Sequence, residues 1–301
     1  MTADPTGIRF HLRTAHSSAE ITQVGAALRA LTVGGVDLVP RYPDDLPTPA
    51  ASGVVLVPWP NRIRDGRYSF AGEDLRLAIS EPKFGNASHG LLRFGTYQPL
   101  EQTEERLVLA ADVVPQTGYP FHLRTRVAFV LEHDGIRVTH EIENVGARTA
   151  PVALGVHPYL QIGGVDTADL VVRSTGTTTL VLDDRNIPVD EVPVGPGTDL
   201  RGGLRLGDAA LDNGYRGMER DAAGRAVHTL TAPDGRRLEL WQDEGFRWAQ
   251  VFTTDRYPGH PLAVAIEPMT APANAFASGI DLDTLESGGE MRREWGVRLV
   301  A

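Results

Sequence analysis

The chain of 301 residues is 42% apolar and carries 39 acidic against 29 basic residues, a formal net charge of −10. This balance argues against a nucleic-acid partner, because phosphate backbones are bound by concentrated positive charge, and the absence of cysteine excludes disulfides and thiolate metal sites. No apolar run approaches the length of a membrane span, and residues 1–5 lack a signal-peptide pattern, so we expect no membrane partner and a cytoplasmic location.

Short segments in which apolar and polar residues alternate predict β-strands from the start of the chain. Gly34-Gly35 suits a hairpin turn that needs positive φ, and Asp134-Gly135 is a strong hairpin signal. Residues 81–93 read as a loop. The strands predicted in this half of the chain are 8–13, 26–31, 36–39, 54–57, 67–70, 75–77, 106–114, 123–132 and 136–143.

The second half continues the pattern, with strands predicted at 152–156, 170–172, 177–182, 226–231, 237–241, 248–253 and 262–266. Between them, residues 183–203 are rich in turn formers and read as irregular, and residues 212–215 read as a loop. Short helices are predicted around 198–203 and 281–287. Because no domain boundary or repeat interrupts the strands, the chain 1–301 is predicted to form one all-β domain, a large antiparallel β-sandwich.

Two apolar stretches end in a titratable residue followed by proline. His157 precedes Pro158 after one such run, and Glu267 precedes Pro268 after another. A residue before proline is pushed towards β or polyproline conformation, and we expect each strand to stop at this point. If the two strand ends meet in one cleft, the site holds an acid and a base.

Further motifs accompany these two residues along the chain. In order they are Pro60-Asn61-Arg62-Ile63 with Gly66 and Phe70, His89-Gly90, His157-Pro158-Tyr159, Asp212, Glu267-Pro268 and Asn274-Ala275-Phe276. Their order and spacing over nearly the whole chain resemble the aldose 1-epimerase (galactose mutarotase) family. The resemblance implies a large antiparallel β-sandwich with an open sugar-binding cleft, a small-molecule sugar as partner, and no cofactor or metal.

The same resemblance implies roles for individual residues. It makes His157 the general acid and Glu267 the general base, while Arg62, His89 and Asp212 position the sugar. Whether the chain is a monomer or a homodimer, and which sugar is its natural substrate, are left open by the sequence.

Three more residues are expected to contact the sugar. Asn61 belongs to the first motif, and Trp59 and Tyr159 can stack on a sugar face. Trp59 between two prolines also resembles a bacterial subgroup that includes members similar to sulfoquinovose mutarotases. The positions that depart from the common family pattern, which bear on the substrate more than on the chemistry, are Leu91, Leu160, Gln161 and Met269.

The chemistry explains the residue types. To interconvert α and β anomers, a base takes the proton from the C1 hydroxyl while an acid protonates the ring oxygen, and the ring opens to an aldehyde. Rotation about C1–C2 and ring closure then reverse both transfers. This favours a histidine with a pKa close to neutrality, and an acid and a base on opposite sides of the ring. Arg62 and His89 are expected to donate hydrogen bonds to the oxygen that becomes the carbonyl.

Other functions fit the same residues. A hexose-6-phosphate or other anionic-sugar epimerase, for example one acting on sulfoquinovose, would need Arg64, Arg67 or Arg93 to face the cleft and bind the anion. A non-catalytic sugar-binding module would not need an acid together with a base.

Two further reaction classes are less well supported by the sequence. A glycosidase would use two carboxylates, Asp212 and Glu267, and would leave His157 without a role. A metal enzyme would draw on His89, His157 and Glu267, but no closely spaced pair of ligands supports it.

Overall fold

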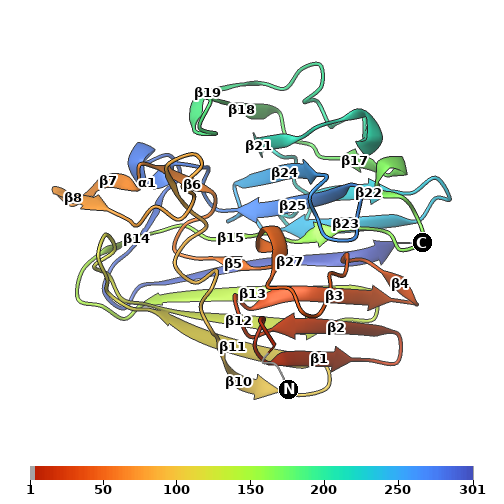
Figure 1. Ribbon diagram of the computed structural model, residues 1–301, viewed down its shortest axis with the longest axis horizontal. Helices are drawn as coiled ribbons and strands as arrows, with labels where there is room; N and C mark the ends of the chain where they lie inside the picture. The colour runs from red at the N-terminus through yellow and green to blue at the C-terminus, as the bar shows by residue number, and fades with distance from the viewer. Residues whose placement is uncertain (1–3, 301) are drawn as a thin grey trace.

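The computed structural model describes residues 4–300, and nearly all of the regular structure within them is antiparallel β-strand (Figure 1). Residues 1–3, part of the opening segment considered above, lie outside the described residues, as does residue 301. The predicted all-β antiparallel architecture is confirmed. Within residues 4–300, no helix is long and apolar enough to cross a membrane.

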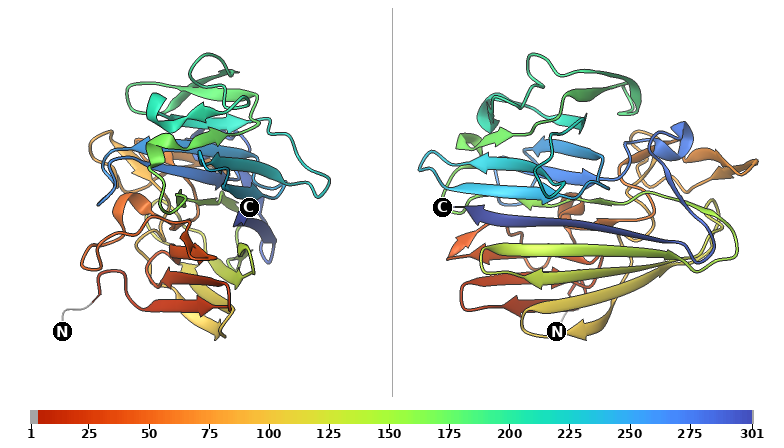
Figure 2. Two further views of the ribbon diagram at one scale, coloured as in Figure 1. Left: turned by 90° about the vertical axis from the view of Figure 1, so that its right-hand side faces the viewer. Right: turned by 180° about the vertical axis from the view of Figure 1, so that it is seen from behind.

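The largest sheet has nine strands. In spatial order they are β10 (Gln98–Gln102), β11 (Arg106–Val113), β12 (Leu123–Leu131), β13 (Gly135–Asn144), β27 (Glu290–Val300), β23 (Arg237–Gln242), β22 (Ala226–Thr231), β17 (Val171–Arg173) and β20 (Leu204–Arg205). A separate four-stranded sheet contacts its β11, β12 and β13 (Figure 2). Its strands are β1 (Arg9–Arg13), β2 (Ser17–Thr22), β3 (Ala27–Val33) and β4 (Val36–Asp37).

Strand β12 illustrates how the sequence produces this packing. Leu123, Val127 and Phe129 are buried, whereas Arg126 on the opposite face is exposed. Because successive side chains of a strand point to opposite faces, the alternation gives the sheet one apolar and one charged face. The apolar face belongs to the main hydrophobic core of the molecule.

The second large sheet has eight strands. Its strands are β19 (Pro188–Pro193), β18 (Thr178–Leu182), β21 (Asp212–Arg216), β24 (Trp248–Thr254), β25 (Ala263–Met269), β15 (Gly155–Val156), β5 (Val55–Leu56) and β16 (Tyr159–Leu160), which also pairs with β25. Every residue of β25 is buried. Strand β25 and the first four residues of β24 therefore belong to the packed interior.

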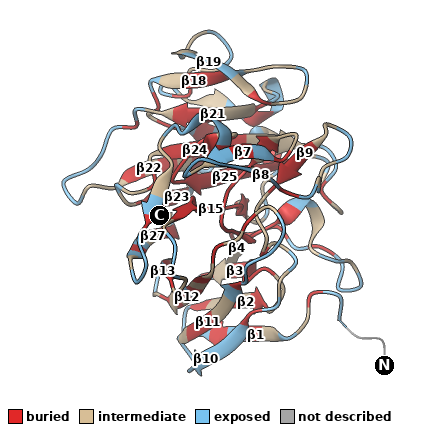
Figure 3. Ribbon diagram, turned by 90° about the vertical axis from the view of Figure 1, so that its left-hand side faces the viewer, coloured by how far each residue is buried: buried red, intermediate tan, exposed pale blue. Residues whose placement is uncertain are grey.

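Several short elements lie near one end of the eight-stranded sheet. The paired strands are β6 (Arg62–Arg64) with β9 (Asn86–Ser88), β7 (Arg67–Phe70) with β8 (Glu73–Arg76), and β14 (Ala150–Val152) with β26 (Asp283–Leu285). Figure 3 shows that β9 is buried, whereas β8 is largely exposed. The helical pieces are α1 (Ala275–Ser278) and the 3-10 turns η1 (Pro49–Ala51), η2 (Thr167–Asp169) and η3 (Leu206–Asp208).

The strand that carries Glu267 does not stop at Pro268, contrary to the prediction, because β25 continues to Met269. Ile266 N donates to Pro158 O, and Thr270 N donates to Leu154 O. Backbone nitrogens of alternate residues in a strand point to the same edge, so the nitrogen of Pro268 lies between those of Ile266 and Thr270 on this edge. It faces the break between β15 and β16. Proline is tolerated here because the neighbouring chain is interrupted between β15 and β16 and requires no hydrogen bond from this position.

Several other local predictions are wrong. Residues 212–215 form part of strand β21 rather than a loop, and the stretch 183–203 contains strand β19. The loop predicted at 81–93 contains β9, and the helix predicted around 281–287 is replaced by β26. Residues 198–203 contain turns but no helix. For β9, β21 and β26, pairing with a strand distant in the sequence decides the local structure.

Candidate active site

A cavity of about 300 Å³ opens beside β24 and β25. Its walls come from residues that are distant in sequence, on η1, the β6–β9 pair, the β15–β16 break, β21, β24 and β25. Seven of the eight residues predicted to act on the sugar line it: Asn61, Arg62, His89, His157, Tyr159, Asp212 and Glu267. The structure thus brings together residues that span most of the chain.

His157 and Glu267 lie in direct contact in the wall of this cavity. Nε2 of His157 is 3.3 Å from Oε1 of Glu267, and the two side chains are only 6% and 3% exposed. Burial lowers the pKa of His157 to about 3 and raises the pKa of Glu267 well above its usual value, with the nearby Asp212 carboxylate adding to the rise. Above the pKa of His157, the single proton that the pair keeps therefore resides on Glu267.

Two details of this pair differ from the sequence-based expectation. The imidazole and carboxylate lie next to each other, rather than on opposite sides of a space the size of a sugar ring. The pKa of His157 is shifted away from neutrality, because the imidazole is buried against β25 and its charged form loses hydration. Neither burial nor the spacing of the two side chains can be read from the sequence motifs.

Arg62 projects into the cavity from β6 and is held by Glu81. Its Nε and Nη2 donate to the two carboxylate oxygens of Glu81 over 2.9 and 3.1 Å, a bidentate pair, and Nη1 donates to Oδ1 of Asn61 over 3.3 Å. Glu81 itself lines the cavity. Glu81 could not be predicted from the sequence, since nothing in the motif around Arg62 indicates a partner elsewhere in the chain.

His89 is placed by an unusual backbone. It adopts a φ of 63°, and its N–H donates to the carbonyl of Asn61 over 2.8 Å. A Cβ on the following Gly90 would lie 2.2 Å from the carbonyl oxygen of Val57, so only glycine fits there. The His89 ring meets the His157 ring edge to face, with 5.5 Å between centroids. Burial lowers the pKa of His89, which keeps the imidazole neutral.

Asp212 faces the pair from strand β21. Nε2 of Gln250 donates to Oδ1 of Asp212 over 2.6 Å, and Gln250 is the register partner of Glu267 in the β24–β25 ladder. Burial raises the pKa of Asp212. Gln250 is a cavity residue that was not predicted, although an amide in a largely apolar predicted strand is a usable signal.

The aromatic candidates divide into two groups. Tyr159 stacks on His157, with 5.2 Å between ring centroids, and lines the cavity. Trp59 is buried against Phe276 at 5.6 Å and does not line the cavity. An aromatic residue between two prolines is therefore used here for core packing, so the sugar contact expected of Trp59 has no geometric support.

Known proteins resemble this chain in sequence and in fold. The sequence model described as aldose 1-epimerase matches residues 9–297. The chain belongs to the aldose 1-epimerase family. It is 34% identical over 278 residues to the uncharacterized protein YihR of Escherichia coli (strain K12), covering 90% of this chain and 86% of that protein.

Solved structures show the same fold at low sequence identity. A galactose mutarotase-like protein from Clostridium acetobutylicum superposes with a TM-score of 0.84 at 16% identity, covering 96% of this chain and 94% of the other. The GalM/aldose epimerase homologue from C. elegans also gives 0.84, at 17% identity, covering 97% and 98%. These likenesses establish that the chain has the galactose mutarotase-like fold of large antiparallel sheets.

The arginines that bear on an anionic substrate lie in three different places. Arg64 forms an ion pair with Asp183, and Arg67 lines a separate hollow beside the β7–β8 hairpin. Arg93 lines the cavity, with its guanidinium over the Phe94 ring at 4.5 Å. Among residues 4–300, no carboxylate forms an ion pair with Arg93, and its Nε is buried without a hydrogen-bond partner. This member of the family thus presents an unpaired cation to its cavity.

Several other polar atoms of the cavity wall also lack a partner within residues 4–300. They are Nδ1 of His89, Nδ1 of His157, Oη of Tyr159 and Oε2 of Glu267. Buried polar groups are normally hydrogen-bonded, and groups left unpaired in a cavity favour a polar ligand. The described residues contain no group of three or more side chains arranged to hold a metal ion.

Proposed function

We propose that this family member is a mutarotase, a cofactor-independent isomerase that interconverts the α and β anomers of an aldose. The observation that carries the proposal is the buried contact of 3.3 Å between Nε2 of His157 and Oε1 of Glu267 in a cavity lined with unpaired polar atoms. Binding alone requires no acid in contact with a base. Ring opening requires both.

The adjacency of His157 and Glu267 suits the reaction, because the two oxygens that exchange protons share one carbon. In the reactive form of the pair, its single proton has moved from Glu267 to His157 across their 3.3 Å contact. The carboxylate of Glu267 then takes the proton of the C1 hydroxyl while His157 gives its proton to the ring oxygen. The bond between C1 and the ring oxygen breaks, leaving an aldehyde at C1 and a hydroxyl at the former ring oxygen. The pair ends with one proton, now on Glu267, so its total proton count is unchanged.

Ring closure runs through the same pair in reverse. After rotation about C1–C2, His157 removes the proton from the hydroxyl as its oxygen attacks the other face of the aldehyde, and Glu267 returns a proton to the carbonyl oxygen. Arg62, held by Glu81, supplies positive charge beside the oxygen on which negative charge develops. Asp212 and Gln250 are placed to hold sugar hydroxyls.

Arg93 favours a second candidate, a mutarotase for a sugar that carries a phosphate or sulfonate. Arg93 is partly buried and has no carboxylate partner in the described chain, and an unpaired buried charge is costly. An anionic group on the substrate would pair with it, in a bidentate arrangement for which guanidinium is well suited.

One experiment tests both candidates. The return of freshly dissolved α anomers to equilibrium is followed by polarimetry for glucose and galactose, and by NMR exchange for glucose 6-phosphate and for glucose with a 6-sulfonate. Acceleration of the neutral sugars supports a broad mutarotase. Acceleration confined to an anionic sugar supports the second candidate, and saturable binding without acceleration of any of them would favour a non-catalytic sugar-binding protein.

A further inference from the structure

The segment that follows Glu267 contacts two other parts of the cavity wall through Thr270 and Asn274. Thr270 N donates to Leu154 O over 2.8 Å, and Leu154 N donates to Oγ1 of Thr270 over 2.9 Å. Thr270 is fully buried, and Leu154 precedes β15 in the stretch that leads to His157. A single run of chain therefore joins the Glu267 carboxylate to the segment that carries His157.

Asn274 makes the corresponding contact with β6. Its backbone N–H donates to the carbonyl of Arg62 over 2.6 Å, and its Oδ1 accepts from the N–H of Arg64 over 3.0 Å. Asn274 thus forms hydrogen bonds with Arg62 O and Arg64 N, the backbone groups on either side of Ile63. This is the hydrogen-bond pattern of a parallel β-bridge. The side-chain oxygen takes the place of the main-chain carbonyl.

The backbone of Asn274 is adapted to this contact. It adopts a φ of 64°, in the left-handed region that asparagine tolerates better than most residues. Asn274 also precedes helix α1, yet its side chain does not cap the helix. Its amide oxygen is used for β6 instead.

Strand β6 needs such support. It has three residues, and on its other edge it pairs with β9, where Arg62 is opposite Ser88. A two-stranded pair of this length is unstable alone. Asn274 hydrogen-bonds to the free edge at both ends of β6, and one of the two bonds is to the backbone of Arg62, whose side chain enters the cavity.

We propose that Asn274 is a positioning residue that fixes Arg62 relative to Glu267, an inference that rests on the proposed mutarotase function. It acts through the backbone of β6 and does not touch the sugar. The short chain from Glu267 to Asn274, anchored midway by Thr270, sets the separation of the carboxylate and the guanidinium.

The test uses two substitutions of Asn274, one that removes the side-chain acceptor and one that keeps it. Asn274→Gly keeps the left-handed backbone but removes the acceptor for Arg64 N, whereas Asn274→Asp keeps an acceptor oxygen. We expect kcat/KM to fall about tenfold in Asn274→Gly, as for a small misplacement of a binding group, and to recover in Asn274→Asp. The control is Asn186→Gly, the same substitution at another residue with positive φ, for which residues 4–300 provide no side-chain hydrogen bond.

A double-mutant cycle separates positioning from general destabilisation. The Arg62→Lys substitution already removes the bidentate pair with Glu81. In the Arg62→Lys variant, Asn274→Gly is therefore expected to change kcat/KM less than about twofold, because the guanidinium that Asn274 positions is absent. An equal tenfold fall in both backgrounds would overturn the proposal, because the effect would then not pass through Arg62.

Hydrogen exchange gives a readout that does not depend on activity. In Asn274→Gly, the peptide that contains β6 should exchange faster than in the wild type and in Asn186→Gly, while a peptide from β13 stays unchanged. Unchanged exchange at β6 would overturn the proposal. If the wild type accelerates no sugar, the mutarotase proposal fails, and the exchange result still decides whether Asn274 holds β6.

Discussion

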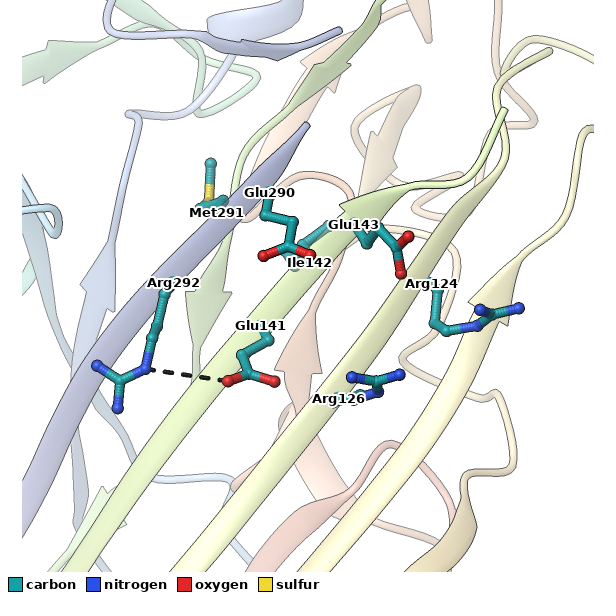
Figure 4. A pocket seen from close by; sticks show the side chains of 8 residues that line it. All are labelled: Arg124, Arg126, Glu141, Ile142, Glu143, Glu290, Met291 and Arg292. Atoms are coloured by element: carbon teal, nitrogen blue, oxygen red, sulfur yellow. Dashed lines mark ion pairs between the residues drawn. The ribbon is translucent and has the colours of Figure 1, made fainter. Parts of the chain in front are cut away.

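Two hollows of similar size carry ionisable side chains in this molecule, and they differ in their access to water. One, of about 280 Å³, lies on the outer face of β12, β13 and β27 (Figure 4). Its charged residues are Arg124, Arg126, Glu141, Glu143, Glu290 and Arg292. The other is the cavity of about 300 Å³ that contains His157 and Glu267.

The charges of the first hollow pair across exposed strands. Arg126 is opposite Glu141 in the β12–β13 register, and Glu141 lies 4.0 Å from Arg292, with both of these side chains more than half exposed. Such pairs are screened by water and contribute little to stability. In the cavity, by contrast, burial shifts the pKa values of His157 and Glu267 in opposite directions. Removal from water, more than the number of charges, prepares a site for proton transfer.

The largest effect is expected from the buried pair. His157→Asn and Glu267→Gln should each lower the enzymatic rate of anomer exchange about 10²- to 10⁴-fold, the usual contribution of a positioned proton-transfer group. Glu141→Gln, the matched change in the exposed hollow, should leave the rate within about twofold. The measurement is α/β exchange by NMR, with thermal unfolding to check that each variant is folded. Equal losses in all three variants would contradict the comparison.

A second difference concerns the arginines. Arg93→Gln should raise KM for an anionic sugar about 100-fold while leaving any activity on glucose nearly unchanged, because it removes the unpaired cation of the cavity. Arg126→Gln, in the exposed hollow, should change neither value. KM is measured for both sugar classes in both variants. An Arg93→Gln enzyme that keeps the wild-type preference would assign Arg93 a structural role.

Burial should also be visible in stability. His140 is fully buried, its Nε2 accepts from Nε1 of Trp295 over 2.9 Å, and burial lowers its pKa to about 3. Because the folded-state pKa is depressed, the stability contributed by neutral His140 is present above the unfolded pKa of about 6.5 and is lost as the pH falls. Between pH 6 and pH 4 this residue should add about 1.4 kcal/mol per pH unit to the slope of the unfolding free energy.

Urea unfolding at several pH values measures that slope. His140→Gln should reduce it by the equivalent of about one bound proton. The same slope in His140→Gln as in the wild type would show that His140 titrates normally in the folded protein.

The smallest effect belongs to the exposed hollow itself. Replacing Arg292 by Gln removes its 4.0 Å contact with Glu141 and its 2.5 Å ion pair with Glu294, and should change the unfolding free energy by less than about 1 kcal/mol. Denaturant unfolding at pH 7 checks this. A cost of several kcal/mol would mean that this charged face is a stabilising network rather than a solvated surface.

Local patterns predicted the elements that local chemistry determines. The Asp134-Gly135 turn joins β12 and β13 near the expected residues, and the alternation in 106–114 matches β11 closely. The apolar run before Glu267 likewise predicted a buried strand. In these places the turn chemistry and the side-chain period agree with the tertiary structure.

The sequence was less informative where a distant partner decides the structure. Asp212-Asn213-Gly214 reads as a turn, yet it pairs with β24 and becomes strand β21. Glu81 and Gln250 join the cavity only because β6 and β25 bring Arg62 and Glu267 beside them. The motifs identified side chains that line the cavity, but neither their burial nor their pairing could be derived without the fold.

The pH dependence of kcat/KM tests the central claim, a buried His157–Glu267 pair that holds one proton. The pKa of His157 is lowered to about 3 and that of Glu267 is raised, so the one-proton state spans the interval between them. With a substrate that does not itself titrate, kcat/KM should show no acid limb between pH 5 and pH 7, after the spontaneous rate is subtracted. An acid limb centred near 6.5, the ordinary value for histidine, would contradict the account, because His157 would then titrate independently of Glu267.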